Sequence, residues 1–162
     1  MTVVSDTSPI SNFFRIGQLL LLKQVYGSIV IPVEVLEELK SLVDFGLNPS
    51  NIISQDWIEV KPTFSTDIFF LPKQKIHVGE AAAISLAKEL QAKFILIDDR
   101  KGQMLALQQN LQPIGTLGTL KIAKEKGIIA DVKDSLDKML TVANYWLSRK
   151  VYNDFLNTCK EL

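Results

Sequence analysis

A short apolar run near the N-terminus ends in an acid, and this feature constrains the fold most. Residues 2–6 read Thr-Val-Val-Ser-Asp, and Ser8 and Pro9 follow closely. Ser8 can cap a helix and Pro9 suits its first turn, so we expect a strand that passes directly into a helix. That pattern is typical of the first, central strand of a parallel α/β sheet, where sites form beyond the carboxyl ends of the strands. Asp6 is therefore a candidate site residue, with an ordinary turn aspartate as the alternative.

Strand and helix patterns alternate along the chain. Further strands are predicted at 28–31, 56–60, 93–97 and 112–115, with 56–60 at an edge and 93–97 buried on both faces. Helical patterns cover 9–26 (with a break at Gly17), 32–42, 79–91, 100–110, 116–126, 132–143 and 150–160. The residues around 45–50 read as a loop, and 62–77 read as a long irregular segment. Such alternation predicts a parallel sheet of four to five strands with helices on both faces.

Composition sets limits on the class of protein. The 162 residues fit one domain, and 18 basic residues balance 18 acidic ones, so any attraction to nucleic acid must come from a local patch. The single cysteine, Cys159, excludes an internal disulfide and fits a reducing compartment. We see neither a signal-peptide pattern nor a run long enough to span a bilayer, and we therefore expect a cytoplasmic protein.

Two glutamates occupy unusual positions on their helices. Glu38 falls at the edge of the apolar stripe of its helix, and Glu80 falls on the inward face of the next long helix, between Ile84 and Ala87 in projection. An inward carboxylate is costly unless it is paired or binds a cation. The alternatives are a solvated rim glutamate for Glu38 and a simple complement to the positive helix start for Glu80.

Asp98 and Asp99 end the most apolar strand. We expect one of them to face the site and the other to cap the following helix. An open α/β sheet can bring these acids, Asp6, Glu38 and Glu80 to one edge, where they repel each other unless a cation lies between them. Oxygen ligands favour Mg²⁺ or Mn²⁺, and the absence of Cys/His clusters argues against structural zinc. Two such ions could clamp the oxygens of an in-line phosphoryl displacement.

These acidic segments resemble, in order, the motifs of the PIN domain family. The matching stretches are Val-Ser-Asp-Thr-Ser-Pro-Ile at 4–10, Ile-Pro at 31–32 with Glu-Leu at 38–39, Gly-Glu-Ala-Ala-Ala-Ile at 79–84 and Leu-Ile-Asp-Asp-Arg at 96–100. Ile-Gly-Thr-Leu-Gly at 114–118 also resembles a PIN subgroup whose third acid is the Glu of a Gly-Glu-Ala helix start. The resemblance runs from residue 2 to about 133.

The resemblance implies a three-layer α/β/α fold and a Mg²⁺- or Mn²⁺-dependent endoribonuclease, a hydrolase of phosphodiester bonds. Many similar proteins are VapC-like toxins of prokaryotic type II toxin–antitoxin pairs, which cut RNA and are inhibited by a small antitoxin. By that match the catalytic and metal-binding acids are Asp6, Glu38, Glu80 and either Asp98 or Asp99. The match also places the hydroxyls of Thr7 and Ser8 near the site. Arg100 and Lys101 could contact phosphate, although a solvated helix start explains them equally well.

The remaining segments lead to expectations about organisation. We expect one PIN-like domain over residues 1–162, with the last two helices, about 132–162, as a C-terminal extension. The resemblance favours a homodimer, and Trp146, Leu147, Tyr152 and Phe155 would pack on the core or on a second subunit. Residues 62–75 would dock an antitoxin or simply fold over the core.

Other functions are open on sequence alone. A non-catalytic PIN-like module that binds RNA or protein is the main alternative. A receiver-type phosphoacceptor domain needs its acid pair after the first strand, whereas here the pair comes late. A phosphate-loop NTPase is disfavoured because 115–119 lacks the Gly-Lys-Ser/Thr ending.

Overall fold

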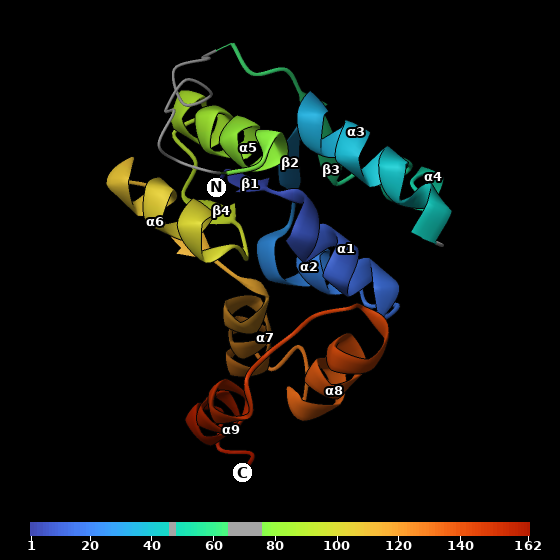
Figure 1. The fold of residues 1–162 in the computed structure, drawn as a ribbon, viewed down its shortest axis with the longest axis vertical. Coiled ribbons are helices and arrows are strands. Elements are labelled where there is room, and N and C mark those ends of the chain that lie inside the picture. Colours follow the sequence, from blue (N-terminus) through green and yellow to red (C-terminus); the bar gives the residue numbers. More distant parts are fainter. Residues whose placement is uncertain (46–47, 65–75) are drawn as a thin grey trace.

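The described part of the chain contains one parallel sheet. The computed structural model describes residues 1–45, 48–64 and 76–162 (Figure 1). The strands are β1 (Val3–Ser5), β2 (Ile29–Pro32), β3 (Ile58–Lys61), β4 (Phe94–Leu96) and β5 (Pro113–Ile114). Their order is β3-β2-β1-β4-β5, and every neighbouring pair is parallel. The predicted sheet is thus confirmed, with β1 in the centre and β3 at an edge.

Helices connect the strands and continue beyond the last one. They are α1 (Thr7–Arg15), α2 (Leu20–Tyr26), α3 (Val33–Ser41), the 3-10 helix η1 (Leu42–Phe45), α4 (Ser50–Ile53), α5 (Val78–Glu89), α6 (Arg100–Gln108), α7 (Thr116–Glu125), α8 (Lys133–Val142) and α9 (Arg149–Thr158). Two of these, η1 and α4, were not predicted; they lie on either side of the loop expected around 45–50. None of the described helices combines the length and the apolar character that crossing a bilayer requires.

Alternate strand residues enter two hydrophobic clusters, one on each face of the sheet. On β1, Val3 belongs to one cluster and Val4 to the other, because successive side chains of a strand point to opposite faces. Buried residues of α5 and α6 complete the cluster around Val4, and buried residues of α1–α4 and α7–α9 complete the cluster around Val3. The expected three-layer α/β/α arrangement is therefore confirmed (Figure 1).

The start of α1 differs from the prediction. The helix begins at Thr7, and Asp6, with an extended backbone, takes the N-cap position, so the assignment of Ser8 as the cap is wrong. The reason is a long-range contact: the Asp6 N–H donates to the Leu96 carbonyl at 2.8 Å, which holds Asp6 in the sheet until the chain turns. The break expected at Gly17 is present, where φ is +72° between α1 and α2.

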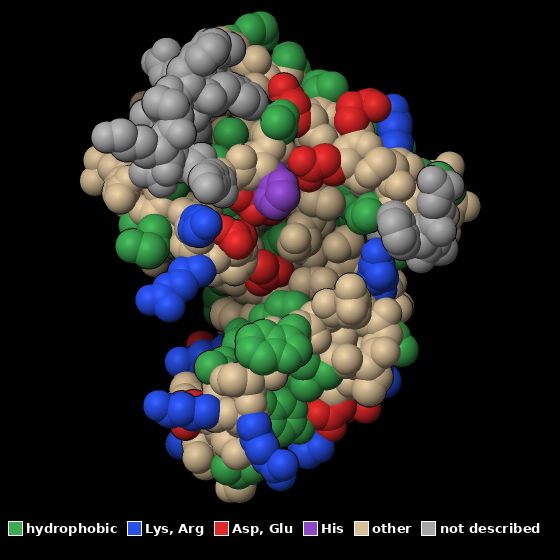
Figure 2. Space-filling view, viewed as in Figure 1, with side chains coloured by type: hydrophobic (Ala, Val, Ile, Leu, Met, Phe, Trp, Pro, Cys, Tyr) green, Lys and Arg blue, Asp and Glu red, His purple; other side chains and the backbone are tan. Residues whose placement is uncertain are grey.

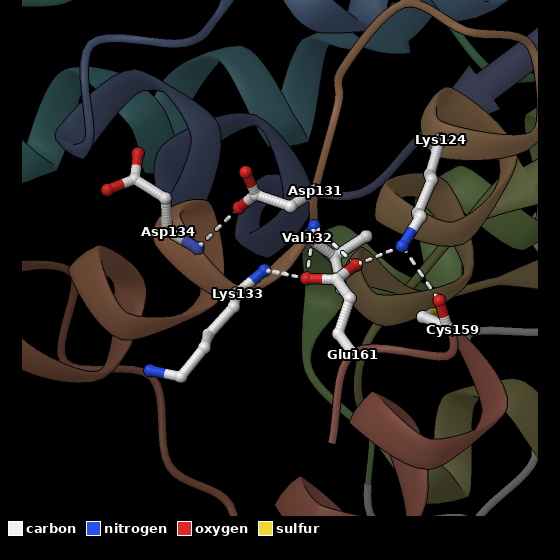
Figure 3. Close-up of polar contacts among 7 residues, drawn as sticks. All are labelled: Lys124, Asp131, Val132, Lys133, Asp134, Cys159 and Glu161. Atoms are coloured by element: carbon white, nitrogen blue, oxygen red, sulfur yellow. Dashed lines mark hydrogen bonds and ion pairs between the residues drawn. The ribbon is translucent and has the colours of Figure 1, made fainter.

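Residues of α8 and α9 pack on the same core as the sheet. Leu136, Met139 and Phe155 lie in the cluster around Val3. A polar contact also fixes the chain end: the Glu161 carboxylate accepts hydrogen bonds from the Val132 and Lys133 N–H groups and from Lys124 Nζ (Figure 3). These contacts join the C-terminus, the start of α8 and the last turn of α7.

The side chains expected to pack on the core or on a second subunit divide into two groups. Leu147, Tyr152 and Phe155 pack in or against the core, whereas Trp146 is 80% exposed. Of the segment expected to dock an antitoxin, residues 65–75 lie outside the described residues, and the described Phe64 is exposed.

Candidate active site

Asp6 lies at the carboxyl end of the central strand and is only 3% exposed. Its Oδ1 atom is buried and has no hydrogen-bond partner within the described residues. The pKa of Asp6 is raised to about 7, mainly by burial; the Thr7 N–H lowers it, and the charges of Glu80, Glu38 and Asp98 contribute to the rise. A carboxylate in this position is costly unless it takes up a proton or a cation.

Glu38 joins three helices at the same edge of the sheet. It extends from α3, and its Oε1 accepts a hydrogen bond from the Gly79 N–H at the start of α5 at 2.9 Å. Its Oε2 accepts a short hydrogen bond from the Thr7 hydroxyl on α1. A Cβ at position 79 would overlap the Glu38 carboxylate, so the close approach requires glycine there.

Glu80 points inward, as its place on the helix predicts, and is 6% exposed. Its Oε2 accepts a hydrogen bond from the His77 N–H at 3.2 Å. Burial raises the pKa of Glu80, and the charges of Asp99 and Glu38 act in the same direction, whereas His77 lowers it. The first turn of α6 lies against this carboxylate, because a Cβ at Gly102 would be 3.6 Å from its Oε2.

The two adjacent aspartates after β4 have different surroundings. Asp98 accepts hydrogen bonds from the Thr116 N–H at 2.6 Å, the Thr116 hydroxyl at 2.7 Å and the Asn12 amide at 3.1 Å. Burial raises the pKa of Asp98, and these hydrogen bonds lower it. Asp99 is exposed and caps α6, accepting from the Lys101 and Gly102 N–H groups at 2.9 and 3.1 Å.

Three predicted contact residues take different positions. The Thr7 hydroxyl is engaged by Glu38, and the exposed Ser8 accepts a hydrogen bond from the Ser11 hydroxyl through its carbonyl. Arg100 is exposed at the start of α6. Sequence reasoning did not identify Asn12, Thr116 or Gly79 as site residues. Gly79 and Thr116 did leave a local signal: Gly79 precedes an inward-facing glutamate at a helix start, and Thr116 lies in the stretch at 114–118 that resembles the family.

Comparison with known families shows to which family this chain belongs. A family model described as a PIN domain matches residues 2–161. The chain belongs to the PIN domain family. PIN domains are generally nucleases, which hydrolyse phosphodiester bonds and use divalent metal ions. Comparisons with curated proteins and with solved structures found no match.

The acidic edge of this PIN domain has no cationic side chain paired to it in the described structure. The ion pairs among the described residues all lie away from this edge, for example between Lys124 and Glu161. Within residues 1–45, 48–64 and 76–162, no three His, Cys, Asp or Glu side chains are already placed to hold one metal ion. The donors nevertheless fit a hard cation, because they are carboxylates and include the unpartnered Asp6 Oδ1.

The space-filling view shows how this site meets the surface. Acidic side chains surround the single histidine on the face that carries the N-terminal ends of α3 and α5, and basic side chains lie beside α6 (Figure 2). Below the acidic group the surface is hollowed toward α7 (Figure 2). This face of the domain therefore presents negative charge at the site and positive charge beside it.

Proposed function

We propose that this PIN domain is a Mg²⁺- or Mn²⁺-dependent endoribonuclease whose metal ligands come from Asp6, Glu38, Glu80 and Asp98. The observation that carries the proposal is the buried, unpartnered Oδ1 of Asp6, surrounded by the charges of the three other acids. Such a group is unfavourable in the apo protein and becomes favourable when a divalent cation neutralises it. Bound there, the metal would supply an activated water and neutralise charge on the phosphate.

The other side chains position the ligands. The Thr7 hydroxyl and the Gly79 N–H each hold one oxygen of Glu38. The Asn12 amide and the Thr116 hydroxyl both donate to one oxygen of Asp98, and the Thr116 N–H donates to the other. Ligands oriented in this way lose less freedom when a cation binds. Removal of such supports typically costs roughly 10- to 100-fold in metal affinity or activity. Asp99 supports the site as the cap of α6, and Arg100 and Lys101 at that helix start would contact substrate phosphates.

We also propose a cellular role and an organisation for the chain. The Gly-Glu-Ala motif at 79–81 supports a VapC-like toxin of a prokaryotic type II toxin–antitoxin pair, which acts in the cytoplasm as a homodimer and is inhibited by a small antitoxin. Residues 1–162 would form one domain with α8 and α9 as its extension, because both helices share the hydrophobic core of the sheet. Co-expression of the chain with the product of a neighbouring small gene tests the pairing.

The direct test is cleavage of a fluorescent single-stranded RNA by the purified protein with Mn²⁺. We expect wild-type protein to cut, chelator to stop the reaction, and Asp6→Asn to lose roughly 100-fold or more in rate. Asp56→Asn is the matched control, because the Asp56 side chain is 87% exposed and pairs with Lys23 at the surface. Equal metal-dependent cutting by wild type and Asp6→Asn would contradict the proposal.

A further inference from the structure

Trp146 is an exposed aromatic side chain that belongs to neither hydrophobic cluster of the described residues. It lies in the segment that joins α8 to α9 and is 80% exposed, whereas its neighbours Tyr145 and Leu147 pack against the hydrophobic core. The second tryptophan, Trp57, is 5% exposed. A fully packed tryptophan contributes a large apolar area to stability, and Trp146 gives up most of that gain by facing solvent.

The segment that carries Trp146 has a defined conformation. Asn144 adopts a left-handed backbone with φ of 55°, and the Tyr145 N–H donates to the Met139 carbonyl at 3.4 Å. On the other side, the Ser148 side chain caps α9 by accepting from the Val151 N–H at 3.2 Å. Trp146 is therefore presented between two anchored points, which reduces the entropy lost when a ligand binds to it.

One residue of the same segment interacts with the acidic site. Burial raises the pKa of the phenol of Tyr145, the residue before Trp146, and the charge of Asp98 raises it as well. The segment passes below α1 and α2 and alongside α7 on its way to α9 (Figure 1). In the space-filling view hydrophobic side chains gather in that region of the surface, below the acidic group (Figure 2).

A nuclease with this site needs attraction from outside the acidic edge. The carboxylates repel the phosphates of a nucleic acid, so affinity must come from flanking groups. Two exposed basic pairs are available, Arg100 with Lys101 at the start of α6 and Arg149 with Lys150 at the start of α9. An exposed indole supplies what these cations lack, a flat surface on which an unpaired base can stack.

We propose that Trp146 is a stacking platform for an unpaired base of the single-stranded nucleic acid substrate, beside the phosphate that is cut. The inference rests on the proposed nuclease function and adds a binding residue from the C-terminal extension. Since every base has a stacking face, Trp146 favours single strands over duplexes without reading a sequence.

Binding can be measured separately from cleavage with a short 2′-O-methyl oligoribonucleotide in EDTA, because the proposed cleavage needs a divalent metal to activate its water. We expect Trp146→Ala to weaken single-strand affinity by roughly tenfold and Trp146→Phe to weaken it less, with duplex affinity unchanged. Leu20→Ala is the control, because Leu20 is a 56% exposed apolar residue on α2. Thermal melting of each variant verifies that it folds.

Fluorescence gives a second reading without mutating Trp146. In a Trp57→Phe variant all tryptophan emission comes from Trp146, and we expect the oligonucleotide to quench it and to protect it from acrylamide. Unchanged single-strand affinity in Trp146→Ala, or unchanged Trp146 emission, would overturn the inference. Self-association that depends on Trp146 while oligonucleotide affinity does not would also overturn it and assign this side chain to a protein contact.

The two proposals fail in different ways. If wild-type protein cuts RNA while Trp146→Ala keeps the wild-type oligonucleotide affinity and KM, the nuclease proposal is supported and the stacking proposal is wrong. If the oligonucleotide binds through Trp146 while Asp6→Asn cleaves as well as wild type, the platform stands and the acidic site loses its assigned role.

Discussion

Asp6→Asn should make the metal-free protein more stable at pH 8, although the same change abolishes the proposed activity. Asp6 is buried, with an oxygen that lacks a partner in the described structure, and its neighbours are other carboxylates. An asparagine there carries no charge, and its amide nitrogen is a hydrogen-bond donor where the carboxylate has only acceptors. The substitution therefore removes a repulsion without leaving a cavity.

The magnitude follows from the pKa of Asp6, which rises from 3.8 to about 7 on folding. Below pH 3.8 the carboxyl is protonated in both the folded and the unfolded chain, so it carries no charge penalty. Between pH 3.8 and 7 the unfolded chain has lost the proton and the folded chain still holds it, so stability falls as pH rises. Above pH 7 the full penalty remains, at most about 4 kcal/mol at 1.36 kcal/mol per unit.

Urea unfolding in EDTA measures the free energy of unfolding of both proteins. The pH should be varied from about 4 to about 8, a range that brackets the unfolded and the folded pKa of Asp6. We expect the stability gap between Asp6→Asn and wild type to be small at the acid end and to grow by a few kcal/mol toward pH 8. Asp56→Asn should keep the wild-type dependence, because Asp56 is at the surface. A gap that does not change with pH, or an Asp6→Asn variant that is less stable at pH 8, would refute the reasoning.

Four further substitutions test other parts of the account. Gly79→Ala should displace the Glu38 carboxylate and cost roughly 100-fold in RNA cleavage, with a smaller loss in thermal stability. Asp98→Asn should abolish cleavage in the same assay, whereas Asp99→Ser, which keeps a helix cap, should retain it. The pKa of Glu161 is lowered: burial raises it, and the hydrogen bonds from Lys124, Val132 and Lys133 lower it more. Glu161→Gln should therefore cost about 1–2 kcal/mol in urea unfolding at neutral pH, with the difference disappearing as Glu161 becomes protonated in acid.

The central strand and its acid were predictable because their signals are local. An apolar run, an acid and a proline in sequence indicate a strand that passes into a helix, and β1 followed by α1 is what the structure contains. The exact cap was not predictable, because the contact between the Asp6 N–H and the Leu96 carbonyl joins residues far apart in the chain. Inward-facing Glu80 was predictable from helical periodicity alone.

The supports of the acids could not be inferred from sequence. Asn12 and Thr116 hydrogen-bond to each other and to Asp98, yet they are 104 residues apart. The choice between Asp98 and Asp99 likewise depends on how the backbone turns after β4, which places one beside Asn12 and the other at the α6 cap. The exposure of Trp146 was also hidden, because an aromatic residue between two helices is equally consistent with packing on the core.

The central claim is that Asp6 and its neighbouring acids form a site for divalent metal ions. A crystal structure of the protein soaked in Mn²⁺, with anomalous scattering to locate the metal, tests it most directly. We predict a manganese peak within coordination distance of Asp6 Oδ1 and of an oxygen of Glu80 or Asp98. Manganese bound only elsewhere, or an Asp6 carboxylate still without a metal at saturating Mn²⁺, would contradict the account.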